Sequence, residues 1–182
     1  NDSPLVLGRT FSDRAAGVHL TTLAKGGTDP VWFDVAVRFG NPTNNKPPSV
    51  AVSGSAATAA LNATVRFTAT ASDSDDSQLA YAWDFGDGSF GTNGPAASKS
   101  YATAGEYVVR CVVSDLRGGI GSDSYLVLVG SPTTVRLSGK VMRDGQPVEG
   151  VRIYTANTKQ TYTDSDGTYI LAGLARGSYT VR

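Results

Sequence analysis

The feature that most constrains this chain is a set of short segments in which apolar and polar residues alternate between turn-forming residues. The clearest contains Leu79, Tyr81, Trp83 and Phe85, whose side chains fall on one face of an extended strand. No window shows the 3.6-residue period of an amphipathic helix. The pattern therefore predicts an all-β protein.

Alternating segments of this kind fill the chain from Ser49 to Val129. Their apolar positions are Val50/Val52, Val65/Phe67/Ala69, Leu79/Tyr81/Trp83/Phe85, Tyr107/Val109/Cys111/Val113 and Tyr125/Val127/Val129. Short strands at turn-bounded intervals are typical of antiparallel sandwiches. We expect residues 49–130 to form one immunoglobulin-like domain that buries its aromatic rings, and tandem immunoglobulin-like antiparallel β-sandwiches to make up the chain.

Two stretches are predicted to be linkers on either side of that domain. Residues 41–48 hold three prolines and no large apolar residue, and residues 131–134 begin Ser-Pro. Before the first linker, Leu5–Leu7, Val18–Leu20 and Val31–Val37 read as three strands. About forty residues bury too little surface to fold alone, so residues 1–40 are expected to be the C-terminal remnant of an upstream β domain, packed on that domain or on the neighbouring one.

After the second linker, residues 135–182 again read as strands. The expected strands are Val135–Val141, Val148–Tyr154, Lys159–Thr163, Thr168–Leu171 and Ser178–Val181. Asp144-Gly145 and Asp166-Gly167 are typical hairpin turns. This segment is expected to be a truncated β-sandwich.

Composition excludes several classes of function. Sixteen basic residues balance sixteen acidic ones, so no global field attracts nucleic acid, and no stretch is long and apolar enough to span a membrane. The chain has one cysteine and one histidine. Cys111 is expected to be a buried apolar residue and His19 a surface or half-buried one, so neither a zinc protease site nor a Ser-His-Asp site can be assembled. We expect no enzymatic activity.

One motif identifies a family. Residues 81–88, Tyr-Ala-Trp-Asp-Phe-Gly-Asp-Gly, resemble the signature of PKD domains (polycystic kidney disease repeats), and Tyr101, residues 105–109 and Asp115 continue the resemblance in order. It covers about 80 residues, from Pro48 to Gly130. Lys99 stands where the family usually has histidine. Asp84 and Asp87 are interpreted as turn residues that accept local hydrogen bonds.

The flanking segments carry further resemblances. Gly139-Lys140-Val141, residues 145–151 and residues 163–169 resemble carboxypeptidase regulatory-like and CnaB-like β-sandwiches. Residues 8–13 and 26–28 are similar to the region that precedes PKD modules in bacterial secreted metalloproteases. This last resemblance implies a parent protein with an upstream catalytic domain.

Calcium is the one cofactor for which the sequence offers ligands. Residues 73–76 place three carboxylates in one loop, and Ca²⁺ takes six to eight oxygen ligands. Some PKD domains of bacterial collagenases bind calcium near the corresponding loop and at the start of the domain. The predicted ligands are Asp73, Asp75, Asp84, Asp115 and Asn45; the alternative is a solvated turn.

These observations predict non-catalytic, secreted or cell-surface binding or spacer modules, as an accessory region of a secreted metalloprotease. The partner would be a protein or polysaccharide polymer surface. A structural or adhesive array that assembles through strand edges is the alternative. A carbohydrate-binding module is a further alternative, although Trp32 and Phe33 are adjacent and therefore point to opposite faces.

Overall fold

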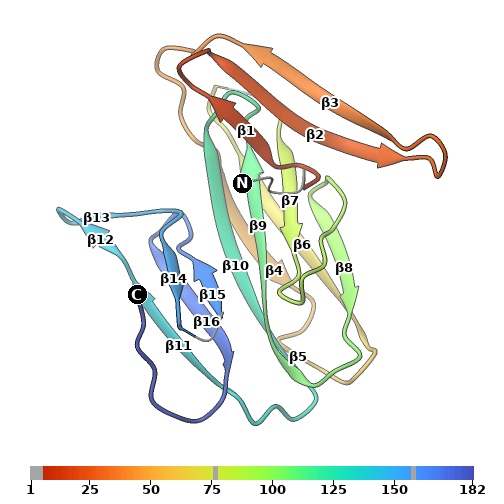
Figure 1. Ribbon diagram of the computed structural model, residues 1–182, viewed down its shortest axis with the longest axis vertical. Helices are drawn as coiled ribbons and strands as arrows, with labels where there is room; N and C mark the ends of the chain where they lie inside the picture. Colours follow the sequence, from red (N-terminus) through yellow and green to blue (C-terminus); the bar gives the residue numbers. More distant parts are fainter. Residues whose placement is uncertain (1–5, 76–77, 157–158) are drawn as a thin grey trace.

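The computed structural model describes residues 6–75, 78–156 and 159–182, and every regular element in these ranges is a β-strand. Figure 1 shows three parts: a small N-terminal sheet across one end, a central sandwich, and a C-terminal group of strands beside β9 and β10. The all-β prediction is confirmed. Within the described ranges, no helix has the length and hydropathy needed to cross a membrane.

The central part is a sandwich of two sheets. The first has the order β4 (Ser49–Gly54), β6 (Thr64–Ser72), β8 (Ala96–Ser100). The second has the order β5 (Thr58–Ala59), β10 (Ile120–Val129), β9 (Gly105–Ser114), β7 (Ala80–Asp84). All pairings are antiparallel except β5 with β10, which is parallel.

The core lies between these two sheets, where the alternation predicted it. Trp83 is fully buried, and the ring centroid of Phe67 lies 6.3 Å from those of Trp83 and Phe85. The indole of Trp83 donates a hydrogen bond to the Gly94 carbonyl at 2.9 Å. Cys111 is also fully buried, as predicted. The aromatic side chains of the signature strand therefore stabilise the domain from inside.

The turn after β7 explains the glycines of the signature motif. Gly86 has a φ of 75°, and a Cβ atom there would lie 2.7 Å from the carbonyl oxygen of Val108. The carboxylate of Asp84 accepts a hydrogen bond from the amide of Gly86. Asp87 accepts two from Ser89 and forms an ion pair with Lys99 at 2.7 Å. Both aspartates thus make the local turn contacts expected of them.

Two strands of the sandwich lacked a sequence signal. β5 has two residues, and β8 is an edge strand of Ala, Ser and Lys with no alternating large apolar residues. An edge strand is held by its ladder to one neighbour and buries little of its own surface. The hydrophobic pattern therefore could not reveal it.

The N-terminal part is a three-stranded antiparallel sheet of β1 (Thr10–Asp13), β2 (Val18–Gly26) and β3 (Trp32–Phe39). The second and third predicted strands are confirmed, but the prediction of a strand at Leu5–Leu7 was wrong in its described part. Val6 and Leu7 lead into a turn at Gly8, whose φ is 78°, and the strand begins at Thr10. Leu5 lies outside the described residues.

The C-terminal part consists of paired strands around a small core of Ile153, Leu171 and Leu174. Its pairs are β11 (Val135–Lys140) with β16 (Thr168–Leu174), β12 (Met142–Arg143) with β13 (Gln146–Pro147), and β14 (Arg152–Tyr154) with β15 (Gln160–Tyr162). The hairpin at Asp144-Gly145 is confirmed. The predicted strand at 178–181 is reduced to one bridge between Val181 and Thr155.

Candidate functional site

The predicted calcium ligands gather at the end of the sandwich that faces the N-terminal sheet, with one exception. Asp115 follows β9 and is fully buried; its carboxylate accepts hydrogen bonds from the amides of Arg117 and Gly119 and from the Asn45 side chain at 2.5 Å. The other side-chain atom of Asn45, its Oδ1 oxygen, is buried and has no hydrogen-bond partner. An oxygen of this kind is suited to a cation.

The acidic loop approaches the same place. The carboxylate of Asp75 accepts a hydrogen bond from the amide of Lys46, the residue after Asn45, at 3.3 Å. The pKa of Asp75 is raised, first by a hydrogen bond shared with the Asp73 carboxyl and also by the negative charges of Asp73 and Asp115. Carboxylates crowded in this way are relieved by a bound cation or by a proton. Asp76 lies outside the described residues.

Asp84 does not join this group. In the ladder of β7 and β9, Ala80 pairs with Ser114 and Asp84 pairs with Arg110, so Asp84 sits at the other end of β7. Four residues along a strand correspond to about 13 Å. The structure therefore brings together Asn45, Asp73, Asp75 and Asp115 and leaves Asp84 apart.

These oxygens have the chemistry that calcium takes, but their arrangement is not that of a formed metal cage. Among the described residues, no group of three or more His, Cys, Asp or Glu side chains is placed to hold a metal ion. The Asp115 oxygens are occupied by N–H donors. A cation here would use the Asn45 Oδ1 oxygen and the Asp73–Asp75 carboxylates first.

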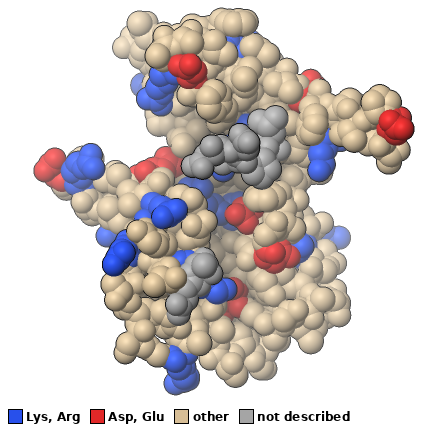
Figure 2. Space-filling model, viewed as in Figure 1, with Lys and Arg blue, Asp and Glu red and all other residues tan. Residues whose placement is uncertain are grey.

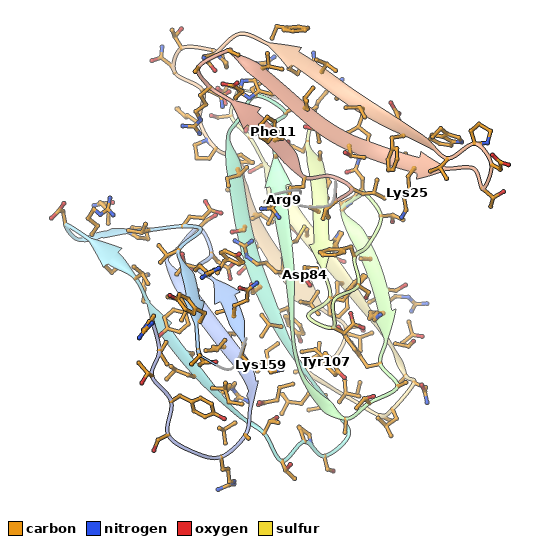
Figure 3. All side chains as sticks on the ribbon, viewed as in Figure 1. Arg9, Phe11, Lys25, Asp84, Tyr107 and Lys159 are labelled. Atoms are coloured by element: carbon orange, nitrogen blue, oxygen red, sulfur yellow. The ribbon has the colours of Figure 1, made fainter. Side chains whose placement is uncertain are left out.

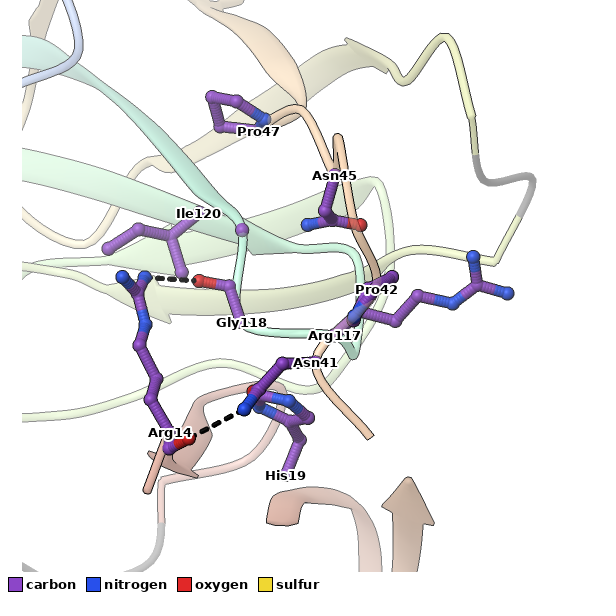
Figure 4. A pocket seen from close by; sticks show the side chains of 10 residues that line it. Arg14, His19, Asn41, Pro42, Asn45, Pro47, Arg117, Gly118 and Ile120 are labelled. Carbon is purple, nitrogen blue, oxygen red and sulfur yellow. Dashed lines mark hydrogen bonds between the residues drawn. The ribbon is translucent and has the colours of Figure 1, made fainter. Parts of the chain in front are cut away.

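A cavity of about 530 Å³ adjoins this cluster, between the N-terminal sheet and the turn after β9 (Figure 4). Arg14 crosses it and donates to the Gly118 carbonyl at 3.1 Å, while Asn41 donates to the Arg14 carbonyl at 2.6 Å. His19 lies at its edge. Expected to be a surface or half-buried residue, His19 is only 1% exposed, because its ring nitrogens bond Ser12 Oγ at 2.9 Å and the Gly40 carbonyl at 3.2 Å.

A second cavity, of about 350 Å³, lies where the three parts of the chain meet. Its walls include the apolar side chains of Phe90, Ile120 and Tyr162, which are 49%, 42% and 39% exposed. Arg9 and Asp84, both labelled in Figure 3, add opposite charges. The cleft therefore offers both apolar surface and hydrogen-bonding groups to a ligand.

Arg110 joins the C-terminal part to the sandwich beside this cleft. It lies on β9, and its guanidinium contacts Asp164 at 2.9 Å and Ser122 Oγ at 2.6 Å. Ser122 in turn donates to Glu149 at 2.5 Å. Burial raises the pKa of Asp164 despite the neighbouring arginine, and burial likewise raises the pKa of Glu149.

A second contact of the same type lies farther along β9. Glu106 is 4% exposed in its side chain and pairs with Arg136 at 2.8 Å, while Thr134 donates to the same carboxylate at 3.1 Å. Sequence reasoning missed both Arg110 and Glu106. A signal existed: each is a charged residue at a position of a core strand where the alternation points away from the sandwich interior.

The one thiol of the chain is not placed for chemistry. Burial raises the pKa of Cys111 to about 12, so the thiolate is scarce at neutral pH. Its side chain packs in the sandwich core with Val109 and Val113. Cys111 is thus a structural residue.

Comparison with known proteins agrees with this geometry. Residues 45–129 match the family described as PKD domain. Collagenase ColA of Clostridium perfringens (strain 13 / Type A) is 37% identical over 86 residues, which are 47% of this chain and 8% of the collagenase. The chain therefore spans only a small part of that curated relative.

Two solved structures are similar to the same region. The PKD1 domain of Vibrio anguillarum Epp has 29% sequence identity and a TM-score of 0.41, and covers 49% of this chain and 100% of its own. The PKD1 domain of the Vibrio cholerae metalloprotease PrtV has 28% identity and a TM-score of 0.40, with 47% and 99% covered. The family assignment rests on the family match, the signature turn and its buried aromatic strand. The central sandwich of this chain is a PKD domain, a non-catalytic type of module.

Proposed function

We propose that this chain is an accessory region of a secreted bacterial metalloprotease, in which the PKD domain serves as a stiff spacer that presents the enzyme to a polymeric protein. The relationship to a collagenase and the burial of the one thiol, Cys111, favour an accessory role. The observation that carries the proposal is that both flanking parts are attached to the PKD domain by partly or fully buried polar contacts. Such a region would act outside the cell.

Stiffness follows from the number and burial of these contacts. On the C-terminal side, Arg110 and Glu106 hold separate positions along β9. On the N-terminal side, Thr10 and Ser114 share a hydrogen bond of 2.5 Å. Removing Arg110 would leave Asp164, whose side chain is only 6% exposed, without its charged partner, and a loss of this kind costs about 3–5 kcal/mol.

The experiment is a distance measurement between spin labels at two exposed sites, Ala15→Cys and Arg143→Cys. Cys111 is buried, so labels attach at the introduced cysteines. A stiff spacer gives one narrow distance distribution, and the variant Arg110→Met broadens it. A broad distribution in the otherwise unchanged protein would contradict the proposal.

The cleft bounded by Phe90, Ile120 and Tyr162 is where we expect the polymer to bind. The test is co-sedimentation with insoluble collagen, with chitin as the polysaccharide control. Tyr162→Ser should reduce retention on collagen, whereas Met142→Ser should not, because Met142 is 46% exposed, against 39% for Tyr162, but lies away from the cleft. Retention on chitin alone would favour the carbohydrate-binding alternative.

Calcium binding at Asn45, Asp73, Asp75 and Asp115 is a second part of the proposal, supported by the unpartnered Asn45 Oδ1 oxygen and the raised Asp75 pKa. A cation there would tie the residues that precede β4 to the acidic loop. At a calcium concentration one hundred times Kd, binding stabilises the folded state by about 2.7 kcal/mol. The melting midpoint should therefore fall when calcium is replaced by a chelator, and the fall should vanish in Asp75→Asn. An unchanged midpoint contradicts this part alone.

A structural array remains a second candidate function. It is favoured by one observation, which is the apolar surface exposed on the N-terminal sheet. It predicts that the isolated chain polymerises with time and concentration, which light scattering measures. A species of fixed size at all concentrations would exclude the array.

A further inference from the structure

The N-terminal sheet has its polar face inward and its apolar face outward. Cross-strand pairing places Phe11, Leu20 and Val37 in one row on one face, and Val18 pairs with Phe39 in the next row. On that face Phe11 is 61% exposed, Val37 46% and Phe39 81%. We call the set Phe11, Val18, Leu20, Phe33, Val35, Val37 and Phe39 the outer apolar face.

The opposite face is the one that contacts the PKD domain. Thr10 and Thr21 are hydrogen-bonded to one another at 2.6 Å, and Thr10 also bonds Ser114 of the sandwich. His19 and Thr21 are each 1% exposed. The usual amphipathic arrangement of a sheet is therefore reversed. The side chains of the outer apolar face on β1 and β3 are 40–81% exposed.

The size of this face matches what a stable interface needs. With aromatic side chains of about 200 Å² and valines somewhat smaller, the exposed fractions leave roughly 500 Å² of apolar surface in water. A standard interface buries about 800 Å² on each partner, of which about 57–65% is apolar. An exposed patch of this size on a monomer usually marks an interaction site.

The charges of the sheet add a preferred direction. Asp13 pairs with Val18 at one end of the face, and Lys25 pairs with Phe33 at the other. Figure 3 labels Phe11 and Lys25 toward opposite ends of the sheet, and Figure 2 shows both acidic and basic side chains on this part of the molecule. A two-fold axis perpendicular to the strands reverses the strand direction, so it brings the acidic end of one copy to the basic end of the other.

We propose that a second copy of this chain covers the outer apolar face, so that two N-terminal sheets stack face to face in a two-fold dimer. Stacked sheets of this kind lie about 10 Å apart, with side chains from both faces interdigitated. The PKD domains then project from opposite sides of the pair. The inference rests on the sheet alone and is independent of the accessory role proposed above.

The experiment is sedimentation of the whole chain at concentrations from about 1 to 200 µM, the range in which a standard interface of moderate quality dissociates. The dimer predicts a species of twice 18.9 kDa at high concentration. Val37→Lys should raise the dissociation constant at least about one-hundredfold, because it buries an unpaired charge at the centre of the interface. Met142→Lys is the matched control, since Met142 is also 46% exposed but lies in the C-terminal part.

Circular dichroism and the melting midpoint of each variant show that it is folded. A monomer at every concentration, or equal dissociation in Val37→Lys and Met142→Lys, would overturn the proposal and leave another protein domain as the occupant of the face.

The orientation has its own test. Lys25→Glu opposes Asp13 of the second copy and should weaken the dimer about tenfold at low salt, and adding Asp13→Asn should recover part of this loss. Asparagine keeps the side-chain oxygen that accepts hydrogen bonds from Ala15 and Ala16. A dimer that is unaffected by Lys25→Glu contradicts the proposed axis.

Discussion

The PKD domain and the N-terminal sheet are built from strands of similar length, yet they bury opposite kinds of surface. In the PKD domain, Phe67, Trp83 and Val109 are at most 1% exposed, and its exposed strand faces are largely polar. In the N-terminal sheet, the residues at 1% exposure are polar, and Phe39 is 81% exposed. The same alternation of side chains therefore supports either a self-sufficient core or an exposed apolar face.

The difference shows that alternation fixes which residues share a face, whereas the neighbours of a sheet decide which face is covered. The PKD domain has a buried core because its two sheets pack their apolar faces against each other. The N-terminal sheet meets the sandwich at the polar turn around Gly118, so hydrogen bonds attach it there and its apolar face remains outside. The C-terminal part is intermediate, with a small apolar core and polar contacts to β9.

The largest expected effect separates the two aromatic environments. Trp83→Ala should destabilise the PKD domain by about 4 kcal/mol, because it leaves a cavity in a packed core. Phe39→Ala should change the unfolding free energy of the monomer by no more than about 0.5 kcal/mol. Urea unfolding at low protein concentration measures both, and similar losses in the two variants would refute the contrast.

Removal of Arg110 should have the next largest effect, and it should be local. Arg110→Met leaves Asp164 buried without its partner and should weaken the attachment of the C-terminal part by about 3 kcal/mol. Hydrogen exchange should then speed up in β14 and β16 but not in β6. The double variant Arg110→Met with Asp164→Leu should recover most of the protection; failure of the second change to help would mean that the pair is not the main contact.

Gly86→Ala tests whether the signature turn requires glycine. The positive φ of Gly86 and the close Val108 carbonyl both oppose a Cβ atom, so we expect a loss of about 2 kcal/mol. Gly145→Ala is the control, because Gly145 also has a positive φ but no atom lies within 4 Å of its added Cβ. Equal losses of stability at the two sites would mean that the positive φ, and not the close Val108 carbonyl, causes the whole effect.

The smallest effect concerns the pH dependence of the C-terminal junction. Because burial raises the pKa of Glu149 and Asp164, the folded state retains these protons more tightly than the unfolded chain does. Their contribution to stability is therefore largest below the ordinary carboxyl pKa values of 4.5 and 3.8, and it falls as pH rises through the raised values. Glu149→Gln should make stability fall less steeply with rising pH and should change the melting midpoint at pH 7 by only about 2 °C. A steeper fall of stability in the variant would contradict the raised pKa of Glu149.

The sequence predicted those strands in which every second side chain is apolar and buried in the core. The strands around Val65, Trp83, Val109 and Val127 were all predictable, because each repeats an apolar residue at every second position. β8 was not, because an edge strand needs only ladder hydrogen bonds. The proximity of Asn45 and Asp115 was expected from the family resemblance, whereas the position of Asp84 depended on a strand register that no local pattern specifies.

The contacts between the parts were the least predictable. Arg110 and Glu106 meet residues that are 54 and 30 positions away, and nothing in the local sequence identifies such partners. The orientation of the N-terminal sheet was hidden for the same reason. Side chains alternate clearly between the two faces of the sheet, but the sequence of β2 and β3 does not indicate which face contacts the sandwich. His19 and Thr21 lie on the face that does.

The most direct test uses the two tryptophans, since Trp83 lies in the PKD core and is 0% exposed, whereas Trp32 lies on the N-terminal sheet and is 52% exposed. Iodide quenching of fluorescence should be compared in Trp32→Phe, which retains only Trp83, and in Trp83→Phe, which retains only Trp32. The account predicts a blue-shifted emission with almost no quenching for Trp83 and strong quenching for Trp32. Equal quenching of the two, or stronger quenching of Trp83, would contradict it.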